Sequence, residues 1–243
     1  MNRFRHARHS LVFVLPFVFT ICLRSLADDG LKLSISSEVS SFFNGERAKF
    51  RSGGNPKAFD LDMEFQYPKC WKRSAGIRPH ILVDLESPAD GGAFCYLQIR
   101  SLSEKMASML GCQASQIRNE IIGLAPQDIE CLANAMFSRE TQLQEYLAIS
   151  RRPVADFSTK RVSIEQCPAA ITIGRIAVER CGVILEGQMS VVSILYKDSL
   201  VAVGTLLPKT DTETDYEFRA RCKLFEPLIF GMANSVVIHD KYK

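Results

Sequence analysis

The sequence is poor in the residues from which common catalytic and metal sites are built. It holds four histidines and one tryptophan in 243 residues. It contains no Gly-x-Ser-x-Gly elbow, no His-Glu-x-x-His pair and no glycine-rich phosphate loop, and no two of its cysteines form a CxxC pair. These absences argue against the common hydrolase, metalloprotease and nucleotide-binding classes and against a zinc site of close-spaced ligands. We therefore expect no cofactor and no bound metal.

The amino end has an apolar run that is too short to cross a membrane. Leu11 to Leu23 follows an arginine-rich start, includes Pro16 and precedes Ser25-Leu26-Ala27. A spanning helix needs about 20 residues, whereas this order of basic, apolar and small residues is typical of a secretion signal. We predict a cleavable signal over residues 1–27, cleavage near Ala27, a periplasmic or secreted product, and no transmembrane span after cleavage.

Once this segment is removed, the chain also lacks an excess of positive or negative charge. The whole chain has 30 basic and 27 acidic residues, and the predicted signal takes away four arginines and no acidic residue, which leaves 26 against 27. Nucleic-acid-binding domains usually carry a clear basic excess. We therefore expect no nucleic-acid partner.

Seven cysteines follow the predicted signal, and in an exported chain these are first of all disulfide candidates. Cys112 and Cys131 lie on neighbouring expected helices with 18 residues between them. Closing that loop would stabilise the fold by about 3 kcal/mol in the chain-entropy model, so this pair is the first candidate. Cys70 and Cys95 could meet across adjacent strands, which makes them the second.

The clearest strand is expected from Phe59 to Tyr67. Aromatic and aliphatic residues alternate there with Asp60, Asp62, Glu64 and Gln66, which is the period of two of a half-buried strand. Residues 28–57 are rich in Ser, Gly, Asn and charge, and we interpret them as a flexible segment with one short strand near 31–35. Residues 58–243 are then a single domain.

Further elements are indicated by the period of the apolar residues. A change to helical spacing predicts a helical insertion of two or three helices at about 103–150, and a stripe with steps of four and three predicts a helix over 218–232 that Pro227 should bend or split. Segments dense in Val and Ile, or bounded by turn residues, predict strands at 80–85, 93–102, 154–165, 169–180, 183–196, 200–207 and 235–238.

These elements together predict the α+β class. We expect one contiguous antiparallel sheet, which starts with the alternating strand that ends at Tyr67 and is covered by amphipathic helices. Tight turns such as Tyr196-Lys197-Asp198-Ser199 make neighbouring strands antiparallel.

The order of elements resembles the PsbP-like fold. An alternating strand that enters Tyr67-Pro68, Trp71 shortly after it, a helical insertion, long antiparallel strands and a closing helix before residues 234–238 carry the resemblance. That group includes the extrinsic subunit of the oxygen-evolving photosystem, the Ran-binding nuclear import factor and bacterial periplasmic DcrB-like proteins. The resemblance implies an α/β/α sandwich over roughly residues 57–239 and a role in docking onto a protein partner or an envelope complex. It implies no shared catalytic residue.

Few residues remain as candidates for function. His80 and His239 stand at the ends of expected strands, where a site could form, although histidines at strand ends are usually solvated. A cation could be bound through oxygen ligands by Asp60, Asp62 and Glu64. The simpler interpretation is that these residues form the solvent-exposed face of a sheet. A partner surface could be formed by three aromatic residues that could equally be core: Tyr67, Trp71 and Tyr96.

We favour an exported, non-enzymatic interaction or assembly module of a bacterial cell envelope with a protein partner. The alternatives are a small periplasmic hydrolase or ligand-binding protein that uses His80 or His239, and a secreted host-contact factor. An enzyme should show a concave site with polar groups that converge on one histidine, whereas an adaptor should show an exposed apolar or aromatic surface.

Overall fold

The computed structural model describes residues 37–88, 92–110, 113–180 and 182–241. Glu38–Lys243 forms one compact unit, and the description below concerns that unit. The predicted signal at 1–27 and the predicted strand near 31–35 lie outside the described residues.

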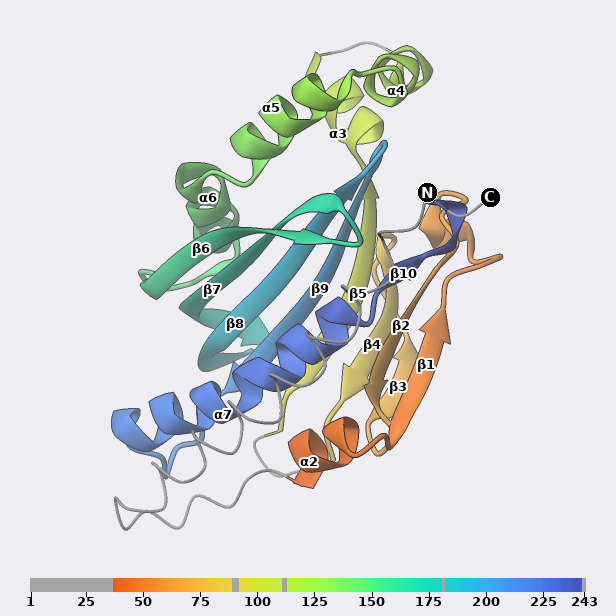
Figure 1. The fold of residues 1–243 in the computed structure, drawn as a ribbon. Helices are drawn as coiled ribbons and strands as arrows, with labels where there is room; N and C mark the ends of the chain where they lie inside the picture. The colour runs from red at the N-terminus through yellow and green to blue at the C-terminus, as the bar shows by residue number, and fades with distance from the viewer. Residues whose placement is uncertain (1–36, 89–91, 111–112, 181, 242–243) are drawn as a thin grey trace, which may run out of the picture. The chain divides into compact units, whose positions relative to one another are not determined.

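The main element is an antiparallel sheet of seven strands in the order β3-β4-β5-β9-β8-β7-β6 (Figure 1). The strands are β3 (Lys72–Ala75), β4 (Ile81–Glu86), β5 (Phe94–Ser101), β6 (Ala155–Ile164), β7 (Cys167–Arg180), β8 (Val183–Tyr196) and β9 (Ser199–Pro208). Six of these follow the predicted segments closely, because long runs of Val and Ile suit a buried pleated surface. The sequence pattern missed β3, whose four residues are all exposed.

The prediction of one contiguous sheet is wrong, because the alternating strand belongs to a second sheet. β1 (Arg47–Arg51), β2 (Met63–Pro68) and β10 (Val237–Ile238) form three strands in the order β1-β2-β10. β2 begins at Met63 and not at Phe59, because Phe59 (φ 51°) and Asp60 (φ 64°) have left-handed backbone after the short 3-10 helix η1 (Pro56–Ala58). From Met63 on, the predicted alternation holds, with Met63 and Phe65 fully buried.

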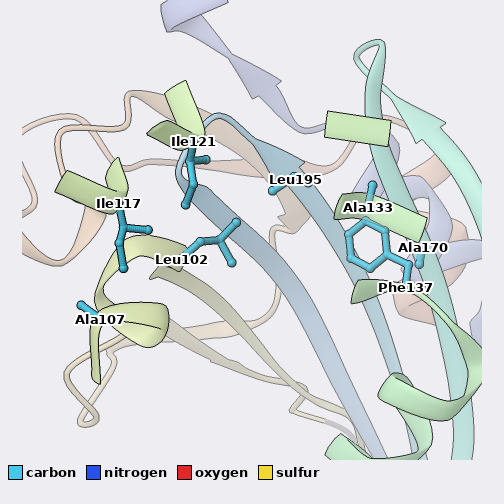
Figure 2. Close-up of a cluster of buried hydrophobic side chains, with 8 residues drawn as sticks. All are labelled: Leu102, Ala107, Ile117, Ile121, Ala133, Phe137, Ala170 and Leu195. Atoms are coloured by element: carbon cyan, nitrogen blue, oxygen red, sulfur yellow. The ribbon is translucent and has the colours of Figure 1, made fainter. Parts of the chain in front are cut away.

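The helical insertion contains four helices where two or three were predicted. They are α3 (Leu102–Leu110), α4 (Ala114–Ile122), α5 (Pro126–Met136) and α6 (Arg139–Ile149). Figure 2 shows how they pack: Ala133 and Phe137 lie against Ala170 of β7, and Ile117 and Ile121 lie near Leu102. A second cluster joins α6 to the same face through Tyr146, whose hydroxyl donates to the Thr172 carbonyl at 2.9 Å.

A buried carboxylate fixes the start of the insertion. Asp198, in the turn between β8 and β9, is 6 % exposed and accepts hydrogen bonds from the hydroxyls of Ser101 and Ser103 and from the Ser103 amide, at 2.7–2.9 Å. Because a buried carboxylate must be fully satisfied, these bonds hold the end of β5 and the first turn of α3 against the predicted hairpin.

The opposite face of the sheet is covered by α7 (Asp215–Asn234), which contacts β8, β9 and β2. Thr214 and Glu217 close its first turn as a capping box, each accepting a hydrogen bond from the other's backbone amide. Pro227 was predicted to bend or split this helix, and the split does not occur, since the helix runs through that residue. Successive strand residues face opposite sides, so Ala170 meets α5 while Ile171 and Ile173 face the side of α7.

The fold is therefore α+β, with helices on both faces of the large sheet, as predicted. Part of the segment predicted to be flexible is ordered here: α2 (Ser37–Phe43), β1 and η1 precede residue 58. A last 3-10 helix, η2 (His239–Lys241), follows β10. Within the described residues, no helix is long and apolar enough to cross a membrane.

Candidate functional site

Neither candidate histidine is part of a catalytic arrangement in the described part of the chain. The His239 Nε2 atom lies 3.5 Å from a Glu64 carboxylate oxygen, within ion-pair range but not aligned for a hydrogen bond. His80 lies just before β4; partial burial, and then nearby Arg100, Arg78 and Lys57, lower its pKa. No described hydroxyl or thiol is hydrogen-bonded to either imidazole, so the pair of nucleophile and base that hydrolysis would need is not formed there.

Two of the three carboxylates of the alternating segment, those of Asp62 and Glu64, are paired with arginine and lysine. Arg51 pairs with Asp62 in a two-pronged contact at 2.7 and 2.9 Å, and Lys49 pairs with Glu64 at 3.1 Å. The Lys49 ammonium is the main reason why the pKa of Glu64 is lowered. The described residues contain no group of three metal-ligating side chains, so this strand face is a surface of ion pairs.

The three aromatic candidates do not lie on one surface. Tyr67 is 5 % exposed and Trp71 is 4 % exposed, so both are packed in the core. Tyr96 is half-buried on β5 and lies across Gly204 of β9, where a side chain would collide with its ring. Burial raises the pKa of Tyr96 to about 12. A partner therefore has no direct access to the rings of Tyr67 and Trp71.

No disulfide joins two of the described cysteines. Cys70 is exposed and Cys95 is buried, so the proposed bond between them is not formed in this structure. Cys131 is exposed, and its predicted partner Cys112 lies outside the described residues, so that pairing stays a prediction. Burial raises the pKa of Cys95 and of Cys222 to about 12, which leaves both thiols protonated and unreactive at neutral pH.

A hollow of about 500 Å³ lies between strands β6–β8 and the carboxyl-terminal half of α7, and we call it the β6–α7 groove. Ile171, Ile173 and Val192 form its apolar floor. The α7 side is formed by Phe230, Ala233 and Asn234, and the β6 side by Ser158, Lys160, Val162, Ser163 and Ile164. The groove is thus mostly hydrocarbon with hydroxyl, amide and ammonium groups along its rim, which is the usual composition of a binding cavity.

Two side-chain contacts flank the groove, one before it and one after it along β6. Before it, Asp156 of β6 pairs with Arg219 of α7 at 3.2 Å. Beyond it, the Lys241 ammonium donates to the Glu165 carbonyl and lies 3.7 Å from the Cys167 sulfur. The first contact joins β6 to α7, and the second joins the turn after β6 to η2, so both lie outside the groove.

Lys160 is the one charged residue that lines the groove. It lies opposite Ile171 in the β6–β7 ladder, and Ser158 lies opposite Ile173. The side chain of Lys160 makes no ion pair with a described carboxylate. One helical turn before Phe230, burial raises the pKa of the Glu226 carboxyl.

β6 is also the outer strand of the large sheet, with no further strand beside it in the described chain. It is ten residues long and contains neither Pro nor Gly, and Ser158, Lys160 and Ser163 are exposed. A bulge interrupts its pairing with β7 near Asp156, which has φ 50°. Such an edge presents backbone donors and acceptors that another strand can pair with.

A second hollow of about 400 Å³ lies between α4, the β8–β9 turn and residues 59–61. Arg118 and Lys197 line it together with Asp60 and Asp240, so its charges are mixed. Neither candidate histidine lines either hollow. The sequence pointed to His80 and His239 as the candidates for catalysis. It gave no signal for the β6–α7 groove or for the β6 edge.

No protein-family model and no curated protein matches this sequence. Among solved structures, the chain resembles the cyanobacterial PsbP, CyanoP, from Synechocystis sp. PCC 6803, with a TM-score of 0.41 and 13% identity over 79% of this chain and 92% of that one. It also resembles LpqN, involved in cell envelope biogenesis of Mycobacterium tuberculosis, with a TM-score of 0.36 and 10% identity over 80% of this chain and 92% of that one. The predicted resemblance to a PsbP-like structure is thus found among the solved structures, and it assigns no function.

Proposed function

We propose that this protein is an exported, non-enzymatic module of a bacterial cell envelope that binds an extended segment of a partner protein along the free edge of β6. The export rests on the predicted signal at residues 1–27. The observation that supports the binding mode is the ten-residue outer edge of β6, which no described strand covers.

The two outer strands of the sheet support this choice of surface. β3 offers four residues, too few to bind a partner strand firmly, whereas β6 offers ten. Added strands gain affinity from main-chain hydrogen bonds and specificity from side-chain pockets next to the edge.

The test is photo-cross-linking in the producing cells, with a benzophenone amino acid at Ser158 or Ser163 of β6 and a matched control at exposed Ser74 of β3. We expect one discrete adduct with another protein from both β6 positions and none from Ser74. The partner protein identified in the adduct is then purified by itself and added to the unmodified chain. Backbone amides at 155–164 should become at least tenfold slower in hydrogen exchange, while those at 72–75 do not change.

Two results would overturn the proposal. The first is an adduct between two copies of this chain, together with a dimer in light scattering, because the edge would then serve self-assembly. The second is protection of β3, or of neither edge, by the purified partner.

A further inference from the structure

We infer that the β6–α7 groove is a binding site for a single-chain anionic amphiphile, a hydrocarbon chain with one carboxylate-like head group. This goes beyond the proposed docking edge, since it concerns the hollow between β6 and α7 and not the outer side of β6. The inference rests on the shape, the apolar lining and the charge of the groove.

The shape favours one long chain. The groove follows β6 from Ser158 to Ile164, about 20 Å at about 3.3 Å per residue. Its volume of about 500 Å³ falls within the range of small-molecule pockets. The floor of the elongated hollow is formed by Ile171, Ile173 and Val192. Binding is therefore most favourable for a ligand that removes hydrocarbon surface from water along the whole length of this floor.

The lining argues against a polypeptide inside the groove. The amides of such a segment would lie on the side chains of Ile171 and Ile173, which offer no hydrogen bond, and unpaired buried backbone groups are unfavourable. A hydrocarbon chain carries no such groups.

The charge of the groove lining favours a negatively charged head group. Lys160 is the only charged residue among those that line the groove, and it has no carboxylate partner among the described residues. A lysine at such a rim can lay its methylenes on the apolar floor near Ile171 and hold its ammonium in water. A head group of negative charge would meet that ammonium, while one of positive charge would be repelled.

The experiment is isothermal titration of the purified protein with dodecanoate below its micelle concentration, compared with dodecyltrimethylammonium at equal chain length. We expect saturable binding of one dodecanoate and no binding of the cation. Lys160→Glu should weaken dodecanoate binding at least tenfold, and the matched change Lys72→Glu on β3 should leave it unchanged. Ile173→Trp should fill the groove and abolish binding, with exposed Ile77→Trp as its control.

Equal binding of both detergents, an unchanged affinity in Lys160→Glu, or no saturation by dodecanoate would each overturn the inference. Binding to vesicles of anionic lipid without binding of dodecanoate would do so too, since it would indicate attraction to a membrane surface. If Ile173→Trp fails to fold by circular dichroism, the exposed Lys160 variant still decides the outcome. Hydrogen exchange of β6 with the purified partner is measured without dodecanoate, so failure of one proposal is distinguishable from failure of the other.

Discussion

The two faces of the large sheet are filled in different ways. On one face, the insertion helices pack small and aromatic side chains tightly against β7, with Ala133 fully buried and Phe137 2 % exposed beside Ala170. On the other, α7 is packed along part of the sheet, while Ile171 and Ile173 remain only partly covered. One sheet therefore combines a face packed closely by the insertion helices with a face that is hollowed beside part of α7.

The largest expected effect is a difference between two phenylalanines, one on each side. Phe137→Ala should lower the free energy of unfolding by about 3–5 kcal/mol, because it leaves a cavity in a closed cluster. Phe230→Ala should lower it by about 1 kcal/mol or less, because this ring is half-buried at the groove. Urea denaturation of both variants measures the contrast, and equal losses would show that the groove wall is ordinary core.

A smaller effect is expected for the hydroxyl of Tyr146. It donates to the carbonyls of Thr172 and Met189 at 2.9 and 3.2 Å, and burial raises the pKa of the phenol well above its usual value. Tyr146→Phe should therefore lower the free energy of unfolding by about 1 kcal/mol. It should leave dodecanoate binding unchanged, since Tyr146 packs on the other face; a change in both quantities would show that the two faces are coupled.

The smallest effect concerns Glu226 on α7. Burial raises its pKa in the folded protein above the ordinary 4.5, so the folded state favours the protonated form and loses stability as pH rises through that raised pKa. Glu226→Gln should stabilise the protein at pH 8 by less than about 1 kcal/mol, with the gain absent at pH 4. Thermal unfolding at the two pH values measures this gain, and a gain of equal size at both would contradict the assigned cause.

Most of the large sheet could be predicted from sequence, and the reason lies in its residues. β7, β8 and β9 are long and rich in Val and Ile, and their turns are short, so periodicity locates them well. β1 and β3 were missed because their residues are mostly charged or polar and exposed. The alternating segment predicted β2 but not its sheet, since periodicity describes a strand and carries no information on its neighbours.

The groove could not be predicted, because it depends on where a helix lies on a sheet. Alternation along β6 places Ser158, Lys160 and Val162 on one side, and that much can be derived from the pattern. The space between this side and Phe230 depends on how α7 lies on the sheet, which involves contacts between residues far apart in the sequence, such as that of Asp156 with Arg219. Similarly, nothing in the pattern around Trp71 or Tyr67 distinguishes a core ring from a partner surface.

Methyl-resolved NMR tests the central claim most directly, because isoleucine and valine methyl groups report on both faces of the sheet in one spectrum. On addition of dodecanoate, we expect the methyl signals of Ile171, Ile173 and Val192 to shift with a common saturation curve, while those of Ile176 and Val191 on the opposite face stay in place. Shifts of equal size on both faces, or none on the side of α7, would contradict the assignment of that side to ligand binding.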